Sequence, residues 1–513
     1  MAITVTPLLT EIDNCDSDAN WDNGGDQTDV KIEGLGAMGI KVSNTTSLVC
    51  KHDQGGVGGV DMSGEHFYVW FMCAGVLDTR PNGGLRIYAE DAAGNWIEWY
   101  VGGSDNYAGG WVRFAVDPNK AGDNVSGTYD PATHRYIGVR FKTIAKWSGG
   151  NPNCFWDWVA YGSGLKITSG VADGITWEDI YQDDLTNAYG VISKVAGVYF
   201  VLGELQFGDA AAGDIDFDDQ NAIIVFSDTT YVASDLFVVT VQGNAAGTTN
   251  FVLGVKSGTQ GISGCVIKSG GTVKFSVVAT DTDIDKLGLY GCTFLDAGTI
   301  ELPPNAANRE ALNCSFVACG QVIVDTCVVK FCFFISSDAD AVLISDDPHY
   351  VTDCSFISCV NGVEIDTYGD GDYDFNNLLF SGCTFDVNNS CGSALTVTKV
   401  GTSNPGTYTG SLVTFAGSVT LKVTVVDKDN VAIENAQVAI YKISDDSQLM
   451  NEDTLATGIA EESYTGATPE DIYVRVRKSS PGNTRYVPTG TTGTIVAQTG
   501  YSVKITLEED PYT

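Results

Sequence analysis

The stretch Cys314-Ser315-Phe316-Val317-Ala318-Cys319 contains one copy of a short pattern that recurs through the middle of the chain. The pattern is a cysteine, any residue and a phenylalanine, and successive copies begin 22, 18, 22 and 29 residues apart. A repeat near 22 residues predicts stacked structural units, one coil of the chain for each copy. The five copies are Cys292-Thr293-Phe294, Cys314-Ser315-Phe316, Cys332-Phe333-Phe334, Cys354-Ser355-Phe356 and Cys383-Thr384-Phe385.

The cysteine and the phenylalanine of each copy are expected to point into the core together, because residues two apart on a strand share a face. Stacked coils then align cysteine on cysteine and phenylalanine on phenylalanine. We therefore predict that these ten residues form a structural core ladder whose thiols are buried and reduced, since a free cysteine packs as a small hydrophobe. The alternative is a β-sandwich in which the spacing of the cysteines is accidental.

The repeat resembles the right-handed parallel β-helix of pectate lyases and phage tailspikes. The resemblance covers residues 201–417. It implies that the longer steps contain loops that bulge from single coils, for example around residues 366–377.

The segment before the repeat, residues 1–200, has a different composition. All nine tryptophans lie at or before Trp177, whereas ten of the 14 cysteines lie between Cys265 and Cys391. Runs such as residues 66–72 and 84–89 alternate apolar and polar side chains, which predicts strands with one buried face. Strands of this kind favour two packed antiparallel sheets. The order of elements resembles the concanavalin-like jelly-roll sandwich of lectins and laminin-G modules.

A third segment, residues 418–513, opens with a clear alternating strand over residues 419–427. The turns after it contain Asn430 and Asn435, and asparagine tolerates positive φ better than most residues. The pattern resembles the carboxypeptidase-regulatory-like, transthyretin-like β-sandwich, which implies a small spacer or adhesion module. The sequence thus predicts an all-β protein of three domains: a jelly roll, a β-helix and a small Ig-like or transthyretin-like sandwich.

The net charge of −37 disfavours binding to nucleic acid, because phosphate backbones are repelled. No stretch approaches the ~20 apolar residues of a membrane span, so no membrane insertion is expected. The first ten residues show no pattern of a signal peptide. These features predict a product that is made in a cytoplasm and stays there until another event releases it. The resemblance to phage tailspikes implies assembly in a host cytoplasm, release by lysis and a place on the virion surface.

Two groups of residues are candidate binding sites. Exposed tryptophans of the first segment can stack on sugar rings as in lectins, although some of them are expected in the core; the candidates are Trp96, Trp99, Trp156 and Trp158. The acidic stretch Asp366, Asp370, Asp372 and Asp374 alternates carboxylates with glycines and is typical of a calcium loop, or else of a solvated acidic turn. No certain cofactor is implied, and Ca²⁺ is the one candidate.

An enzyme that cleaves polysaccharide is the catalytic alternative for a β-helix, and it needs two facing carboxylates. No pair is singled out by the sequence, so we expect no catalytic residue and lean against an enzyme. The acidic candidates outside the calcium stretch are Asp281, Asp283, Asp285, Asp338, Asp340, Asp346 and Asp347.

The function that the resemblances imply is that of a structural surface protein of a bacteriophage, either a tail fibre or spike or a capsid decoration. It is expected to take part in assembly with other virion proteins, to form a homotrimer and to adhere to a host surface glycan. The alternatives are a virion-associated polysaccharide depolymerase acting through paired aspartates of the β-helix, and a bacterial surface adhesin.

Overall fold

The chain is nearly all β in a computed structural model. Within the described part, 46 strands accompany one α-helix, α1 (Trp177–Asn187), and two 3-10 helices, η1 (Asp18–Asn20) and η2 (Pro131–Thr133). None of the described helices has the length and apolar character needed to cross a membrane. The structure describes all residues except 1–2, 33, 35, 43–47, 55–57, 75–76, 78–83, 103–109, 144–151, 170–173, 211–213, 228–236, 244–247, 271–273, 280–282, 303–308, 325, 345–349, 368–371, 418, 465–468, 480–483, 497–498 and 512–513.

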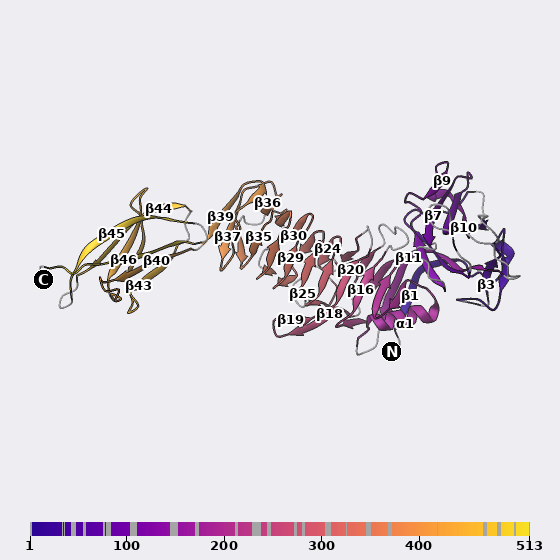
Figure 1. The fold of residues 1–513 in the computed structure, drawn as a ribbon, viewed down its shortest axis with the longest axis horizontal. Helices are drawn as coiled ribbons and strands as arrows, with labels where there is room; N and C mark the ends of the chain where they lie inside the picture. The colour runs from indigo at the N-terminus through magenta and orange to yellow at the C-terminus, as the bar shows by residue number, and fades with distance from the viewer. Residues whose placement is uncertain are drawn as a thin grey trace. The chain divides into compact units, whose positions relative to one another are not determined.

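The chain divides into two compact units, which are described separately. Figure 1 labels their helix and strands. The first unit comprises residues 1–343 with 358–360, and the second comprises residues 344–357 with 361–513. Both contain coils of the repeat. The first unit also holds the tryptophan-rich segment, and the second holds the C-terminal sandwich.

The tryptophan-rich segment forms two antiparallel sets of strands that share one core. The five-stranded sheet has the order β4 (Leu48–Asp53), β10 (His134–Lys142), β6 (Gly84–Asp91), β7 (Trp96–Gly102) and β9 (Asn124–Ser126). The opposite set consists of β1 (Thr4–Asp13), β2 (Gly25–Gln27), β3 (Ala37–Ile40), β5 (His66–Cys73), β8 (Val112–Val116) and β11 (Cys154–Ser169).

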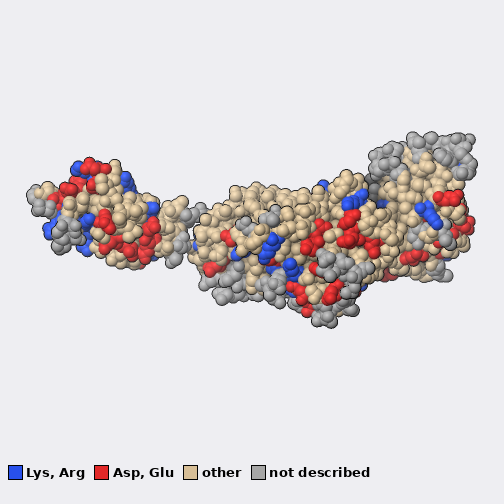
Figure 2. Space-filling view, turned by 90° about the horizontal axis from the view of Figure 1, so that it is seen from below, with Lys and Arg blue, Asp and Glu red and all other residues tan. Residues whose placement is uncertain are grey.

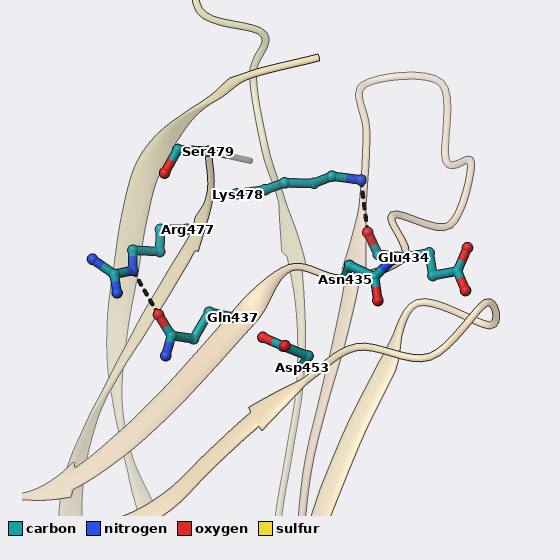
Figure 3. Close-up of a pocket in the computed structure, with 7 residues that line it drawn as sticks. All are labelled: Glu434, Asn435, Gln437, Asp453, Arg477, Lys478 and Ser479. Atoms are coloured by element: carbon teal, nitrogen blue, oxygen red, sulfur yellow. Dashed lines mark hydrogen bonds between the residues drawn. The ribbon is translucent and has the colours of Figure 1, made fainter. Parts of the chain in front are cut away.

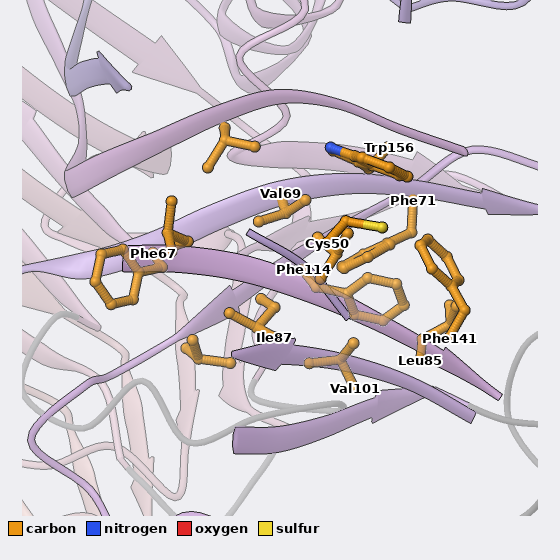
Figure 4. Packing of buried hydrophobic residues seen from close by; sticks show 14 of the residues in the cluster. Cys50, Phe67, Val69, Phe71, Leu85, Ile87, Val101, Phe114, Phe141 and Trp156 are labelled. Carbon is orange, nitrogen blue, oxygen red and sulfur yellow. The ribbon is translucent and has the colours of Figure 1, made fainter. Parts of the chain in front are cut away.

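The core between these two sets is built from the inward residues of both (Figure 4). Phe71 of β5 packs edge-on against Phe141 of β10, with ring centroids 5.6 Å apart, and Phe141 packs against Trp156 of β11 at 5.8 Å. Leu85 and Ile87 of β6 face the same core. The alternation read from the sequence is therefore reproduced, since every second residue of β6 is a core residue.

Parallel stacking begins in the C-terminal half of β11, before the boundary expected at residue 200. Residues Gly164–Ile167 pair in parallel with Glu204–Phe207. From there the chain visits three parallel sheets in a fixed order. The strands of the first unit that follow β11 are, in chain order, β12 (Ile192–Val195), β13 (Val198–Val201), β14 (Glu204–Phe207), β15 (Ile215–Asp219), β16 (Ile223–Phe226), β17 (Val238–Val241), β18 (Thr249–Ser257), β19 (Gln260–Ser263), β20 (Val266–Ser269), β21 (Ser276–Val278), β22 (Lys286–Tyr290), β23 (Thr293–Leu295), β24 (Ile300–Leu302), β25 (Arg309–Leu312), β26 (Ser315–Val317), β27 (Val322–Val324), β28 (Val328–Lys330) and β29 (Phe333–Ile335).

Each sheet grows by one strand for each coil. One sheet runs β14-β17-β21-β24-β27, the second runs β15-β18-β22-β25-β28 and the third runs β13-β16-β20-β23-β26-β29. The pairings within these runs are parallel. Only β12 with β13 and β18 with β19 pair antiparallel here among the described strands. The repeat thus makes stacked coils, not face-to-face antiparallel sheets.

Two corners with left-handed backbone bound the short strand of each repeat copy. The residue before each cysteine position has positive φ, and so does the residue five further on. Glycine and asparagine adopt this conformation readily, whereas most other residues adopt it at a cost in free energy. These corners therefore mark where the chain turns at each end of the short strand. The pairs are Gly291 and Asp296, Asn313 and Ala318, Phe331 and Ser336, Asp353 and Ser358, and Asn377 and Gly382.

The first four copies of the repeat occupy the predicted ladder positions. Their cysteines and phenylalanines are all buried. Phe294 stacks on Phe316 at 5.3 Å and Phe316 on Phe334 at 5.0 Å, each pair with planes 10° apart. In the second unit Phe356 stacks in the same way on the next coil, on Phe380.

The fifth copy does not occupy the ladder, so the sequence-based assignment of Cys383 and Phe385 was wrong. Phe356 pairs with Phe380, and their rings lie 4.8 Å apart with planes 8° apart. Buried Leu378 takes the place of the ladder cysteine. Cys383 instead donates to the carbonyl oxygen of Phe356 at 3.6 Å, as Cys359 does to Phe334 at 3.5 Å.

The coil strands of the second unit follow β30 (Asp340–Ile344), which spans the division between the units. They are β31 (Val351–Thr352), β32 (Ser355–Ile357), β33 (Asn361–Ile365), β34 (Asp372–Asn376), β35 (Leu379–Ser381), β36 (Phe385–Asn389), β37 (Leu395–Val400), β38 (Tyr408–Gly410) and β39 (Val413–Gly417). Residues 372–376 were expected in a bulging loop. They form β34 instead, which pairs in parallel with β37.

The C-terminal segment of the second unit contains two sheets around one core. The three-stranded sheet has the order β43 (Ile459–Tyr464), β40 (Val419–Val426) and β46 (Tyr501–Thr506). The four-stranded sheet has the order β42 (Gln448–Asp453), β41 (Gln437–Lys442), β44 (Glu470–Lys478) and β45 (Tyr486–Ile495). Asn430 and Asn435 have φ of 61° and 56°, which confirms the expectation of positive φ at these turns.

Candidate functional site

The side of the five-stranded sheet that faces away from the core carries the candidate site. On β6, Leu85, Ile87 and Ala89 belong to the core, so the alternating residues Arg86, Tyr88 and Glu90 lie on the opposite side. The registers of the neighbouring strands extend this side. We call it the outer face and define it by Lys51, Arg86, Tyr88, Glu90, Trp96, Glu98, Tyr100, Tyr136 and Arg140.

Two aromatic residues flank a carboxylate in one row across the outer face. Glu90 of β6 pairs with Trp96 of β7 on one side and with Tyr136 of β10 on the other. Neighbouring strands are about 4.8 Å apart, so the two aromatic residues lie roughly 9.6 Å apart along the row. Trp96 and Tyr136 are both half-buried. Solvent therefore reaches part of each of these two residues.

The next row places a glycine beside these rings. Tyr88 pairs with Glu98 on one side and with Gly138 on the other, and Gly138 pairs with Lys51. A Cβ at Gly138 would lie 2.7 Å from the carbonyl oxygen of Cys50 and 3.3 Å from the ring of Tyr88. The absence of a side chain at Gly138, which is itself buried, therefore lets Tyr88 and Lys51 pack together across the row.

Rings and cations pack against one another on this face. Tyr88 and Trp96 are stacked, with centroids 5.7 Å apart and planes 29° apart. The Arg140 guanidinium lies 5.9 Å from the centroid of Tyr88 and 5.7 Å from that of Trp96. The Lys51 ammonium lies 5.0 Å from Tyr88 and 5.5 Å from Tyr136. Such cation–π contacts stabilise ring orientation, so the aromatic residues are held in place before any ligand arrives.

Two carboxylates hold the cations in position. Buried Glu98 accepts from Arg86 Nη1 at 3.0 Å and from Asn124 Nδ2 at 2.6 Å, and it pairs with Arg140 Nη1 at 2.7 Å. Glu90 pairs with Lys51 and accepts from the Tyr88 hydroxyl at 2.5 Å. Burial raises the pKa of Tyr88, and its hydrogen bond to Glu90 raises that pKa further.

The charge of the outer face is unusual for this chain. Three of its nine residues are cations and two are carboxylates, and Asp53 of β4 continues the row of Glu90 and Tyr136. The whole chain, in contrast, carries 28 lysines and arginines against 65 acidic residues. Figure 2 shows acidic side chains at the surface of both units, with lysines and arginines scattered among them. A charge-balanced face with two accessible rings can stack on apolar faces of a polyhydroxylated ring and hydrogen-bond its hydroxyl groups.

No family model matches this chain. The curated proteins contain no match to it either.

Only one of the four tryptophans predicted for sugar binding lies at the surface. Trp96 lies on the outer face. Trp99 and Trp156 belong to the core, with exposures of 1% and 0%. Trp158 is 6% exposed, donates from Nε1 to Glu11 at 3.2 Å and lies under the Arg113 guanidinium at 4.5 Å. Sequence reasoning missed Tyr88 and Tyr136, although both alternate with core residues in runs that it read as strands.

The acidic residues predicted for calcium are only partly described. Asp370 lies outside the described residues, Asp366 accepts from the Thr367 hydroxyl, and Asp374 is an exposed residue of β34, which also contains Asp372. Among the described residues, no group of three or more histidine, cysteine, aspartate or glutamate side chains is placed to hold a metal ion. Calcium binding by this stretch stays a prediction, which melting with and without chelator would test.

The acidic residues considered for glycan cleavage form no pair that the described contacts single out. Asp281, Asp346 and Asp347 lie outside the described residues. Asp338 forms an ion pair with Lys274 at 2.9 Å, and the same lysine lies 3.2 Å from Asp296. Lys274, just before β21, thus bridges to Asp296 before β24 and to Asp338 before β30. These contacts link coils and leave the catalytic alternative without a specific supporting contact.

A polar hollow lies on the C-terminal sandwich of the second unit (Figure 3). Two hydrogen bonds cross it: Arg477 Nε donates to Gln437 Oε1 at 2.7 Å, and Lys478 Nζ donates to the carbonyl oxygen of Glu434 at 2.6 Å. Its charged side chains are largely at the surface. The outer face, with its fixed rings and paired charges, is therefore the better candidate site.

Proposed function

We propose that this protein is a structural surface component of a bacteriophage particle that adheres to a host glycan through the outer face. The observation that carries glycan adhesion is the row Trp96–Glu90–Tyr136, in which two half-exposed rings flank a carboxylate. Rings at that separation can stack on two sugars of one oligosaccharide while Glu90, Lys51 and Arg140 bond to hydroxyl groups. Fixed rings of this kind lose little conformational freedom on binding.

The finer architecture belongs to the same proposal. We assign the tryptophan-rich segment to a concanavalin-like jelly roll, the coils to a right-handed parallel β-helix and the C-terminal segment to a transthyretin-like sandwich. The cyclic visiting of three parallel sheets supports the β-helix, because a right-handed crossover is the rule for parallel strands. The two sheets around each terminal core support the sandwiches.

Three features taken together support the proposed virion location. The chain is strongly acidic, twelve of its 14 cysteines are buried, and its coils resemble those of tailspikes. A protein assembled in a reducing cytoplasm keeps its thiols reduced. The partners in this proposal are other virion proteins, two further copies in a homotrimer and the host glycan.

Mass spectrometry of purified particles tests the location. The proposal expects the chain in many copies per particle, and native mass spectrometry of the isolated chain is expected to give a trimer. If the chain is absent from particles that infect normally, the virion assignment fails. A monomer at micromolar concentration contradicts the trimer alone.

Binding of the purified chain to host surface polysaccharide tests the outer face. Trp96→Ala and Tyr136→Ala are each expected to weaken binding by about tenfold or more, because stacking on one ring contributes on the order of 1–3 kcal/mol. The matched control is Tyr473→Ala in the second unit, where Tyr473 stacks on Tyr441 at 5.2 Å. Full binding by the outer-face variants, or loss in the control, would place the glycan site elsewhere.

The depolymerase alternative is tested in the same incubations. Release of reducing ends from the polysaccharide would show hydrolysis. It would overturn the proposal that the protein binds the glycan and does not cleave it. Unchanged chain length of the polysaccharide supports the adhesion proposal.

A further inference from the structure

Two cysteines of the first unit face each other across neighbouring strands. Cys73 is the last residue of β5 and Cys154 is the first residue of β11, and the two are Cα partners in the antiparallel ladder. Their Sγ atoms are 3.3 Å apart. Both belong to the core, with exposures of 5% and 0%. The thiols are therefore already in contact across the sheet.

The backbone at this position suits a disulfide. The amide of Ala74 donates to the carbonyl oxygen of Asn153 at 2.8 Å. Cys73 and Cys154 are therefore a non-hydrogen-bonded pair of the antiparallel ladder. A pair of this non-hydrogen-bonded type has Cα atoms about 4.5 Å apart. Disulfides span Cα separations of about 4.4–6.8 Å. Closing the sulfurs to the ~2.0 Å of a disulfide bond therefore needs side-chain rotation and little backbone movement.

The ladder cysteines of the coils are arranged differently. Cys292, Cys314 and Cys332 donate to carbonyl oxygens of the preceding coil, at 3.5, 3.3 and 3.4 Å. Their thiols also contact one another along the column, Cys314 with both Cys292 and Cys332, but they lie on stacked parallel coils, whereas Cys73 and Cys154 lie directly opposite each other in an antiparallel pair. The Cys73 and Cys154 pair is thus distinguished from the ladder by geometry.

We propose that Cys73 and Cys154 form a cross-strand disulfide when the folded protein meets a small disulfide oxidant such as oxidised glutathione. The Cys73 thiol loses its proton and attacks one sulfur of the oxidant, which releases one glutathione thiolate and leaves a mixed disulfide on Cys73. Cys154 then loses its proton and attacks Cys73 Sγ, which forms the Sγ–Sγ bond and releases the second glutathione thiolate. The two protons pass to the two thiolates, and the two electrons of the thiols reduce the oxidant.

The order of these two steps follows from the surroundings. Cys73 lies at the end of β5 and is the more accessible of the two. Burial raises the pKa of Cys154, and its contact with Cys73 raises it further, so Cys154 reacts second and only with the adjacent sulfur. Reaction is expected over hours, because a buried protonated thiol is a poor nucleophile.

The bond would close a loop that contains β6, β7, β8, β9 and β10. Three of these strands, β6, β7 and β10, carry most of the outer face. The disulfide would therefore join the two ends of this loop on the opposite sheet and restrict unfolding of the strands that carry the outer face after release into an oxidising medium. The chemistry of the pair does not depend on what the outer face binds.

The test begins with the reduced wild-type chain under native conditions. It is incubated with oxidised glutathione, then unfolded and alkylated, and its intact mass and peptides are determined. The proposal expects two fewer alkylated cysteines than the 14 of the reduced chain and one linked peptide pair that joins Cys73 to Cys154. Oxidised protein is also expected to melt at a higher temperature, and dithiothreitol is expected to reverse the increase.

Variants assign the bond to these two residues. Cys73→Ser and Cys154→Ser are each expected to lose the linked pair and the rise in melting temperature. Cys50→Ser is the matched control, because Cys50 lies in the same core near Cys154 and is expected to leave both unchanged. The proposal is overturned by any of three results for wild-type protein that was folded during the incubation. All 14 cysteines are alkylated after unfolding, a stable glutathione adduct persists on Cys73, or the linked pair involves Cys50.

Discussion

Phe380 stacks on Phe356 in register, with ring centroids 4.8 Å apart and planes 8° apart, whereas Phe385 lies outside this ladder and is half-buried. This stacking is informative because the Cys-x-Phe pattern predicts Phe385, and not Phe380, at this position of the ladder. Leu378 in the place of the ladder cysteine conceals the true copy, Leu378-Leu379-Phe380. The step from Cys354 to Leu378 is 24 residues, which is close to the other steps.

Replacing Phe380 by alanine is expected to destabilise the second unit by about 3–5 kcal/mol, since a buried ring and its stacking contact with Phe356 are lost. Phe385→Ala is the matched control and is expected to cost about 1 kcal/mol or less. Calorimetric melting of the two variants compares them directly. An equal or larger effect of the Phe385 variant would contradict the register.

Ala318 occupies a coil corner at φ 52°, where an L-residue other than glycine or asparagine is strained. Ala318→Gly is expected to stabilise the first unit by about 1 kcal/mol, because glycine adopts this conformation without the Cβ clash. Ala311→Gly in strand β25 is the control and is expected to destabilise, since it removes a buried methyl group and adds chain entropy. Urea unfolding measures both, and the same sign for the two changes would refute the corner assignment.

Glu98 is buried and joins Arg86 and Arg140. Glu98→Gln keeps the shape but removes the charge, so two guanidinium groups lose their counter-ion. We expect a loss of about 3 kcal/mol or more, which is typical of breaking a buried ion pair from one side. Asp429→Asn, in an exposed pair with Lys428, is the control and is expected to leave the melting temperature unchanged. If Glu98→Gln leaves the melting temperature unchanged, the ion pairs of Glu98 with Arg86 and Arg140 do not stabilise the outer face.

The stability of the first unit is expected to fall as pH decreases from about 6.5 to about 4. Burial lowers the pKa of His66 to about 4 and that of His134 to about 3, against an ordinary value of 6.5. In this range the unfolded chain binds a proton at each histidine that the folded chain does not bind. The free energy of unfolding therefore decreases on acidification by about 1.4 kcal/mol per pH unit for each histidine.

His66→Gln isolates one contribution to this pH dependence. The variant is expected to show a shallower decline than the wild type between pH 6 and 4, because His134 still titrates. Chemical denaturation at several pH values measures the difference. Parallel curves for the two proteins would contradict a depressed pKa at His66.

Local patterns were sufficient for much of the fold. The alternation in residues 66–72 and 84–89 predicts strands, and the Cys-x-Phe repeat predicts stacking, because side-chain direction along a strand depends only on neighbouring residues. Positive φ at Asn430 and Asn435 followed in the same way from the conformational tolerance of asparagine.

The candidate site was only partly predictable. Trp96 was named from the sequence, but Trp99 and Trp156 were named beside it. Whether a tryptophan faces solvent depends on which side of its sheet meets the opposite sheet, and that contact joins residues far apart in the chain. Tyr136 and Trp96 become neighbours of Glu90 only because β10, β6 and β7 lie side by side.

The sequence by itself determined the strand content, the stacked repeat and the buried character of its cysteines, since each is a consequence of local alternation and spacing. Tertiary structure alone decided that Phe380 replaces Phe385 in the ladder, because an apolar leucine fills the cysteine column as well as a thiol does. It also decided the outer face and the contact of Cys73 with Cys154. Both depend on strand order and register, which are set by packing between segments that are distant in the chain.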